Sequence, residues 1–225
     1  MKCKCGKEKK LVKRKADMVF TDPPYKLTGG GCKTKDITGF LSGDKFKDKK
    51  KECLFDVPDF KDWVPLVVNF SNVDSEFFIM SNSRNMFLLH PLLLLEKLKI
   101  HNVLIMHKNT GVPHKWYKTV TEFILYYYRG KAINPIGKCG SNVFPVEMPR
   151  ENKKHPNQKP ISFISEIFNN HKNKLVLDPF LGSGSTLIAC EKTNRKCFGM
   201  ELDPHYCSVI IKRWEEFTGK KAVKA

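Results

Sequence analysis

The sequence has no apolar run that could cross a lipid bilayer. The longest candidate, residues 87–95, is about half of the roughly 20 residues that a membrane helix needs. The first residues are charged throughout, so the apolar centre of a secretory signal is also missing. We therefore expect a cytoplasmic protein without a membrane partner.

The sequence also lacks the cysteine spacing of a metal site or a disulfide framework. Its eight cysteines lie at irregular positions, without a CxxC pair or a matching histidine spacing. Cys3 and Cys5 could bind zinc together with Cys32 or Cys53, but this pattern is weak. We expect reduced thiols and no metal.

Acidic residues are few compared with basic ones. The chain has 23 Asp and Glu against 40 Lys and Arg, which gives a formal net charge of +17. Such an excess favours binding to a phosphate backbone and makes that binding salt-dependent. The same charge would also suit RNA or an anionic membrane. Residues 1–225 have the length of one domain, and we expect one.

A motif that can activate an amine follows a mostly apolar stretch near the start of the chain. Asp22-Pro23-Pro24-Tyr25 comes directly after residues 16–21. The carboxylate of Asp22 and the carbonyl of Pro23 can accept both N–H bonds of an exocyclic amine, which directs its lone pair at an electrophilic methyl group. The prolines fix the backbone, and Tyr25 can stack on a base drawn out of a duplex.

A glycine-rich turn follows a second apolar stretch, residues 174–177. From here the chain predicts a strand end, a tight turn and the start of a helix, with the candidate cofactor-binding residues Asp178, Phe180, Gly182, Gly184, Ser185 and Thr186. Glu201 ends the next strand about twenty residues later, the spacing at which a carboxylate reaches ribose hydroxyls. The pattern indicates an adenosine-type cofactor, although such a turn alone also serves dinucleotides and phosphates.

The order of these motifs resembles the beta class of S-adenosylmethionine-dependent DNA amino-methyltransferases, in which the catalytic tetrapeptide precedes the cofactor turn. Four segments carry the resemblance and span nearly the whole chain: residues 22–25, 155–160, 178–186 and 198–206. The resemblance implies an α/β fold, namely a three-layer sandwich of the Rossmann-like class I methyltransferase type in permuted motif order. Its mixed seven-stranded sheet would contain one antiparallel strand.

The same resemblance implies the ligands. S-adenosylmethionine is the expected cofactor, with Asn157 and Gln158 at its amino-acid end and Lys159 in the same cofactor-binding set. Double-stranded DNA is the expected partner. Members of the class are often dimeric and bacterial or phage-encoded, and we expect no nuclease domain in this chain.

Asp in the first position of the tetrapeptide mostly accompanies adenine N6 in this class, whereas Ser or Thr more often accompanies cytosine N4. We therefore expect methylation of adenine N6, with cytosine N4 as the alternative. Methylation of RNA or of a glutamine side chain fits less well, because the cofactor turn then usually precedes an Asn-Pro-Pro-Tyr. Lys7 stands where the class commonly has an Asp that helps hold the cofactor's adenine, which leaves an inactive DNA-binding protein as a further alternative.

The rest of the chain predicts alternating strands and helices, as in a mostly parallel sheet. We expect helices over residues 59–71, 85–98, 161–170 and 204–218, and strands over residues 76–81, 101–107, 122–128 and 196–201. Residues 26–55, rich in Gly and Lys, are expected to form a mobile loop that faces DNA. Residues 108–121 are expected to be a substrate-facing loop, and residues 130–154 a short target-recognition region without regular structure.

Overall fold

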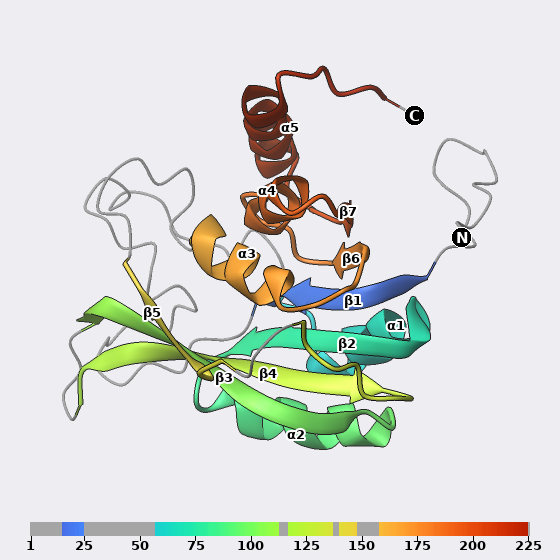
Figure 1. Ribbon diagram of the computed structural model, residues 1–225, viewed down its shortest axis with the longest axis vertical. Helices are drawn as coiled ribbons and strands as arrows, with labels where there is room; N and C mark the ends of the chain where they lie inside the picture. The colour runs from blue at the N-terminus through green and yellow to red at the C-terminus, as the bar shows by residue number, and fades with distance from the viewer. Residues whose placement is uncertain (1–14, 25–56, 113–116, 137–139, 148–157, 225) are drawn as a thin grey trace.

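The computed structural model describes residues 15–24, 57–112, 117–136, 140–147 and 158–224 (Figure 1). In these ranges the strands are β1 (Ala16–Thr21), β2 (Ser71–Ser81), β3 (Lys99–Val112), β4 (Thr119–Arg129), β5 (Val143–Val146), β6 (Leu175–Asp178) and β7 (Lys196–Gly199). The helices are α1 (Phe60–Asn69), α2 (Asn85–Leu95), α3 (Ile161–Asn169), α4 (Ser185–Lys192) and α5 (Pro204–Thr218).

All the described strands join one seven-stranded sheet in the order β5-β3-β4-β2-β1-β6-β7. The pairs β1–β2, β1–β6, β6–β7 and β3–β5 are parallel, whereas β4 runs antiparallel to both β2 and β3. The expected mixed sheet with one antiparallel strand is confirmed.

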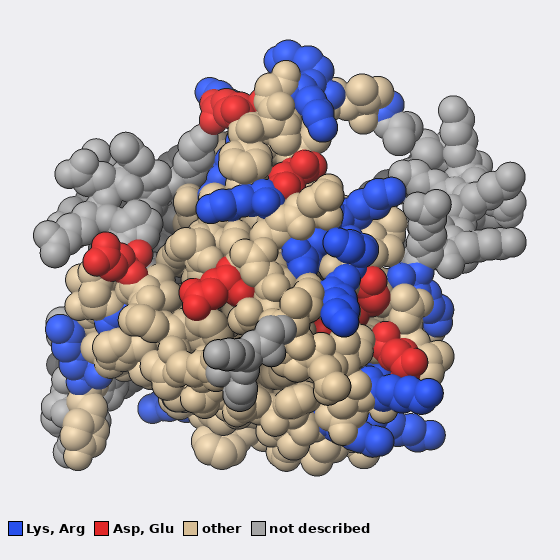
Figure 2. Space-filling model, viewed as in Figure 1, with Lys and Arg blue, Asp and Glu red and all other residues tan. Residues whose placement is uncertain are grey.

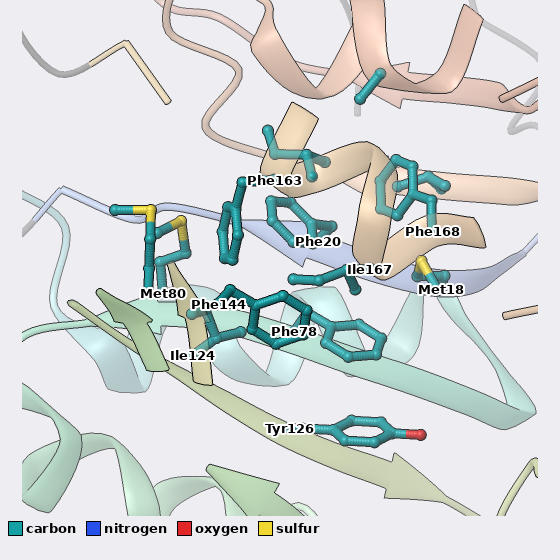
Figure 3. Close-up of a cluster of buried hydrophobic side chains, with 14 of the residues drawn as sticks. Met18, Phe20, Phe78, Met80, Ile124, Tyr126, Phe144, Phe163, Ile167 and Phe168 are labelled. Atoms are coloured by element: carbon teal, nitrogen blue, oxygen red, sulfur yellow. The ribbon is translucent and has the colours of Figure 1, made fainter. Parts of the chain in front are cut away.

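Successive residues of the central strands face two separate cores, because side chains alternate along a strand. Met18 and Phe20 of β1 pack in a cluster with α3 and α4 (Figure 3). Val19, which lies between them, packs in a second cluster with α1 and α2. The same alternation places Tyr126 of β4 in the first cluster and Tyr127 in the second. The sheet is therefore the middle of three layers, and the tyrosines of β4 serve its packing.

The structure corrects several expected boundaries. β3 continues to Val112 and β4 begins at Thr119, so most of the loop expected over residues 108–121 is a hairpin of two long strands. β5 lies inside residues 130–154, where no regular element was expected. This strand is only four residues long, contains Pro145 and lies at the edge of the sheet, so its sequence carries almost no strand pattern.

The chain that follows α5 is held by contacts with Glu215. The Ala222 amide donates to Glu215 Oε1 at 2.9 Å, and the Lys221 ammonium lies 3.0 Å from Glu215 Oε2. Within the described ranges, none of the helices combines the length and hydropathy needed to cross a bilayer.

Candidate active site

The sheet brings the two expected motifs together at the carboxyl ends of neighbouring strands. β1 and β6 pair through Met18 with Val176 and Val19 with Leu177. The Thr21 hydroxyl, at the end of β1, donates to Asp178 Oδ1 at 2.8 Å. Asp22 follows at once, and its side chain is 28% exposed. This edge is where ligands bind in open α/β sheets.

Asp178 is a buried carboxyl group at the centre of this edge. It is 2% exposed and accepts hydrogen bonds from the Thr21 hydroxyl and the Phe180 amide. Burial raises the pKa of Asp178 to about 6, although hydrogen bonds from Thr186, Thr21 and Phe180 act in the opposite direction. Asp178 therefore joins the end of β1 to the start of the glycine turn.

The turn after β6 requires glycine at two positions. Gly182 and Gly184 have φ angles of 54° and 81°, the left-handed region that other residues rarely adopt. A Cβ on Gly184 would also lie 3.2 Å from Ile210 of α5. A Cβ on Gly182 would meet no atom within 4 Å, so this part of the turn borders open space.

Glu201 lies beside that open space. β7 pairs with β6 through Gly199 and Asp178, which brings the end of β7 next to the turn. Glu201 Oε2 accepts from the Gly182 amide at 2.8 Å, while Oε1 accepts from the Leu202 and Asp203 amides at 2.8 and 2.9 Å. Three backbone donors thus fix the carboxylate against the cofactor turn.

Arg213 of α5 is in contact with the glycine turn, a role that the sequence did not predict. The Arg213 side chain is buried, and its Nη1 donates to the Ser183 carbonyl at 2.9 Å, with the Ser183 and Ser185 hydroxyls at 3.3 and 3.4 Å. Burial lowers the pKa of its guanidinium. Ser185, which is expected to bind cofactor, also lies in contact with Arg213, and α5 thereby stabilises the turn.

Phe180 also has a packing role. Its ring lies 5.4 Å from that of Trp63 of α1, in an edge-to-face arrangement at 83°. The aromatic pair attaches the turn to the layer formed by α1 and α2. Among the expected cofactor residues, Gly182 therefore borders open space, while Phe180 and Ser185 make contacts that hold the turn in place.

Lys159 lies at the carboxylate of the tetrapeptide. Its ammonium is 2.7 Å from Asp22 Oδ2 and 3.1 Å from Glu122 Oε2. The sequence motif groups Lys159 with the cofactor, and no local signal points to Glu122, which is 37 residues away on β4. Gln158 is half-buried directly before Lys159.

Other expected residues lie outside the described ranges. These are Tyr25, Asn157, Lys7, the whole of residues 26–55, and the four cysteines considered for zinc, Cys3, Cys5, Cys32 and Cys53. In the part of the chain that the structure describes, no group of three or more His, Cys, Asp or Glu side chains is arranged to hold a metal ion.

A family model described as DNA methylase, of the N6/N4 methyltransferase type, matches residues 16–213. The chain belongs to this family. It is therefore an S-adenosylmethionine-dependent DNA amino-methyltransferase of the N6-adenine or N4-cytosine type, and the resemblance seen in the motifs is confirmed.

Individual members are distant from this chain. It is 26% identical to the type II methyltransferase M2.LlaDCHI of Lactococcus lactis subsp. cremoris, over 91% of this chain and 84% of that protein. It is 25% identical to the DNA adenine methyltransferase YhdJ of Escherichia coli K12, over 91% and 78% of the two chains.

Two solved structures share the fold. The M1.HpyAVI complex with S-adenosylmethionine superposes with a TM-score of 0.65 at 24% identity, covering 89% of this chain and 90% of that one. The cytosine-N4-specific PvuII DNA methyltransferase superposes with a TM-score of 0.65 at 14% identity, covering 92% and 86%. The Rossmann-like methyltransferase fold expected from the motif order is confirmed.

Proposed function

We propose that this protein transfers a methyl group from S-adenosylmethionine to the N6 amine of adenine in double-stranded DNA. The observation that carries the proposal is the position of Asp22, which follows β1 beside Asp178 and the glycine turn. An exocyclic amine has two N–H bonds, and a carboxylate followed by a proline carbonyl supplies the two acceptors.

The proposed mechanism assigns orientation and charge stabilisation to the tetrapeptide. Asp22 and the Pro23 carbonyl accept hydrogen bonds from the two N–H groups of the amine and direct the nitrogen lone pair. When bound, the cofactor supplies an electrophilic methyl group on its sulfonium sulfur. Asp22 stabilises the positive charge that develops on nitrogen, and the product amine loses its proton to solvent. Tyr25 would stack on the flipped base.

The turn suits the nucleoside part of this cofactor. The open space at Gly182 lies next to a carboxylate held by three amides, so Glu201 can accept hydrogen bonds from ribose hydroxyls. Gly182 would let the backbone approach the nucleoside, and Gly184 keeps the turn close to Ile210 of α5, while Thr186 and Asp178 hold the start of α4. Asn157 and Gln158 are proposed to hold the amino-acid end.

Two features favour adenine over cytosine. Asp in the tetrapeptide mostly accompanies adenine N6 in this family, and the relative YhdJ is named a DNA adenine methyltransferase. Cytosine N4 is the second candidate, because the PvuII enzyme, which is cytosine-N4-specific, has the same fold.

DNA recognition is proposed for the segments around this site. The net charge of +17 favours duplex DNA, and residues 26–55 and 130–154 of a single domain would read the target. A homodimer, if formed, would have an apolar surface available on α2, where Phe87, Leu88 and Leu95 are exposed. In a bacterial or phage-infected cell the enzyme would act in the cytoplasm, and restriction would require a separate nuclease chain.

The test is transfer of labelled methyl from S-adenosylmethionine to unmethylated duplex DNA at low and moderate salt, followed by nucleoside analysis, with Asp22→Ala as control. We expect N6-methyladenine. N4-methylcytosine would support the second candidate. Absence of both transfer and cofactor binding would contradict the proposal and favour an inactive DNA-binding protein, with Lys7 as the first residue to revert to Asp.

A further inference from the structure

Four charged side chains of alternating sign form a line that ends at Asp22. Lys159 Nζ lies 2.7 Å from Asp22 Oδ2 and 3.1 Å from Glu122 Oε2, and Glu122 Oε1 lies 3.1 Å from Lys108 Nζ. Asp22 follows β1, Lys108 lies in β3, Glu122 lies in β4 and Lys159 lies in the segment before α3. Only a folded sheet brings them together.

The line is largely shielded from water. The side chains of Lys159 and Lys108 are 12% exposed, that of Glu122 24% and that of Asp22 28%. Burial acts to raise the pKa of Glu122, but the charges and hydrogen bonds of Lys159 and Lys108 outweigh burial and lower it. Desolvating charges costs free energy even when they are paired, so such a line is weak evidence for stability and stronger evidence for a positional role.

The contact with Asp22 is specific to one oxygen. An ionised carboxylate offers two oxygens with about four acceptor positions. Lys159 lies 2.7 Å from Oδ2, which restrains the rotation of the carboxylate and leaves the target amine to be received at Oδ1. A carboxylate that can rotate would align the amine less often, and small misplacements of reacting groups are costly for rate.

Glu122 gives Lys159 a second anionic partner. An isolated pair of Asp22 and Lys159 would be neutral, and the ammonium would cancel much of the field that stabilises the positive charge on the amine nitrogen. With Glu122 at 3.1 Å, the ammonium is shared between two carboxylates, so it cancels less of the field of Asp22 than it would in an isolated pair. Lys108 in turn holds the other Glu122 oxygen.

We propose that Lys159 is a positioning residue for the catalytic carboxylate rather than a ligand of the cofactor, and that Glu122 and Lys108 hold Lys159 in place. This assignment rests on the proposed function, because it gives Asp22 its role in methyl transfer. It predicts that removing Lys159 slows the chemical step and leaves cofactor affinity unchanged.

The first experiment replaces Lys159 with Met and with Arg, with Lys172→Met as the control for an exposed lysine on the opposite edge. For Lys159→Met we expect kcat to fall about thirty-fold, the order of loss caused by misplaced catalytic groups. The KM for S-adenosylmethionine and the dissociation constant of S-adenosylhomocysteine should stay within about twofold of wild type. Lys159→Arg should restore most of kcat, because guanidinium can bridge the same two carboxylates.

The second experiment replaces the two residues of the line that lie beyond Lys159. Glu122→Gln keeps the shape of the side chain, and we expect kcat to fall about tenfold, while Lys108→Met should cost about threefold because it acts through Glu122. In the Asp22→Ala background, Lys159→Met should have no further effect, since its action passes through the missing carboxylate. Melting temperatures of all variants show whether the graded losses of kcat arise from a general loss of stability.

The outcomes distinguish the two proposals. If the wild type methylates DNA but Lys159→Met keeps its kcat and weakens cofactor binding, Lys159 belongs to the cofactor and the positioning role is wrong. A further loss of rate from Lys159→Met in the Asp22→Ala background would also overturn it. If the wild type transfers no methyl group to DNA, the proposed function fails and the positioning role fails with it.

Discussion

The two ends of the parallel strands carry opposite chemistry. At the carboxyl ends lie Asp22 after β1, Asp178 at the end of β6 and Glu201 after β7, each in contact with named partners. At the opposite ends lie exposed basic side chains, among them Lys15 before β1, Lys99 at the start of β3, Lys174 before β6 and Lys196 at the start of β7. Figure 2 shows blue side chains gathered on the side where β1 begins in Figure 1.

The acids at the amino ends serve the backbone instead. Asp17 accepts from the Lys174 and Leu175 amides at 3.0 and 2.8 Å, and Asp74 accepts from the Lys131 amide at 2.8 Å. The same residue type thus binds backbone amides at the amino ends of the strands and forms the proposed reactive site at the carboxyl ends. The exposed lysines at the amino ends of the strands lie away from Asp22 and can supply long-range attraction to an anionic polymer.

The strongest test of this contrast is Asp22→Ala. We expect kcat for methyl transfer to fall by about a thousandfold or more, because one of the two amine acceptors is lost at the point where charge develops. S-adenosylhomocysteine binding, measured by calorimetry, should stay within about twofold of wild type. Asp62→Ala, an exposed acid on α1, is the matched control and should be fully active. If Asp22→Ala keeps its turnover, Asp22 is not the catalytic carboxylate and the contrast between the two ends of the strands is wrong.

Asp178 should make stability depend on pH in an unusual direction. Because burial raises its pKa to about 6, the folded chain takes up this proton before the unfolded chain, whose carboxyl has its ordinary pKa near 4. As pH falls from 7 to about 4, the wild type should gain up to about 3 kcal/mol in free energy of unfolding relative to Asp178→Asn. Urea unfolding of both proteins across this range measures the difference. If the difference between the two proteins does not change with pH, the pKa of Asp178 is not raised in the folded chain.

Glu201→Gln probes the carboxylate held against the turn. Losing the charge weakens hydrogen bonds that are worth about 1.5 to 3 kcal/mol each when charge-assisted, so we expect cofactor affinity to fall about ten- to hundredfold. The DNA concentration needed for half-maximal rate should change little. Glu216→Gln on the exposed side of α5 is the control. Equal affinity in Glu201→Gln and wild type would speak against a contact with the ribose.

The smallest effect is expected at the amino ends of the strands. Replacing Lys174 and Lys196 together with Gln should change the free energy of unfolding by less than about 0.5 kcal/mol, as for ordinary surface sites. The kcat at saturating DNA should be unchanged. DNA affinity should fall slightly and become less sensitive to salt, measured by fluorescence anisotropy at several salt concentrations. A large loss of kcat would mean that this edge takes part in the reaction.

Local patterns predicted what depends on neighbours in the sequence. The strand before Asp22, the turn at Gly182 and Gly184 and the bounds of α5 all follow from runs of a few residues, and the motif order then gives the sheet. β5 was missed because a strand of four residues at the edge of the sheet is too short to show a clear alternation of apolar and polar residues. The contacts of Lys159 with Glu122 and of Arg213 with Ser183 were missed because each joins residues far apart in the chain.

The pairing of β1 with β6 delays the completion of the sheet during synthesis. Thr21 and Asp178, which hydrogen-bond across this pair, are separated by 157 residues. At ribosomal rates of about 5 to 20 residues per second, β1 waits roughly 8 to 30 s for its neighbour. During this interval one side of an apolar strand has unpaired backbone groups, which favours pairing with other nascent chains. Slower translation should lengthen this exposure and lower the yield of folded protein, and added chaperones should raise that yield.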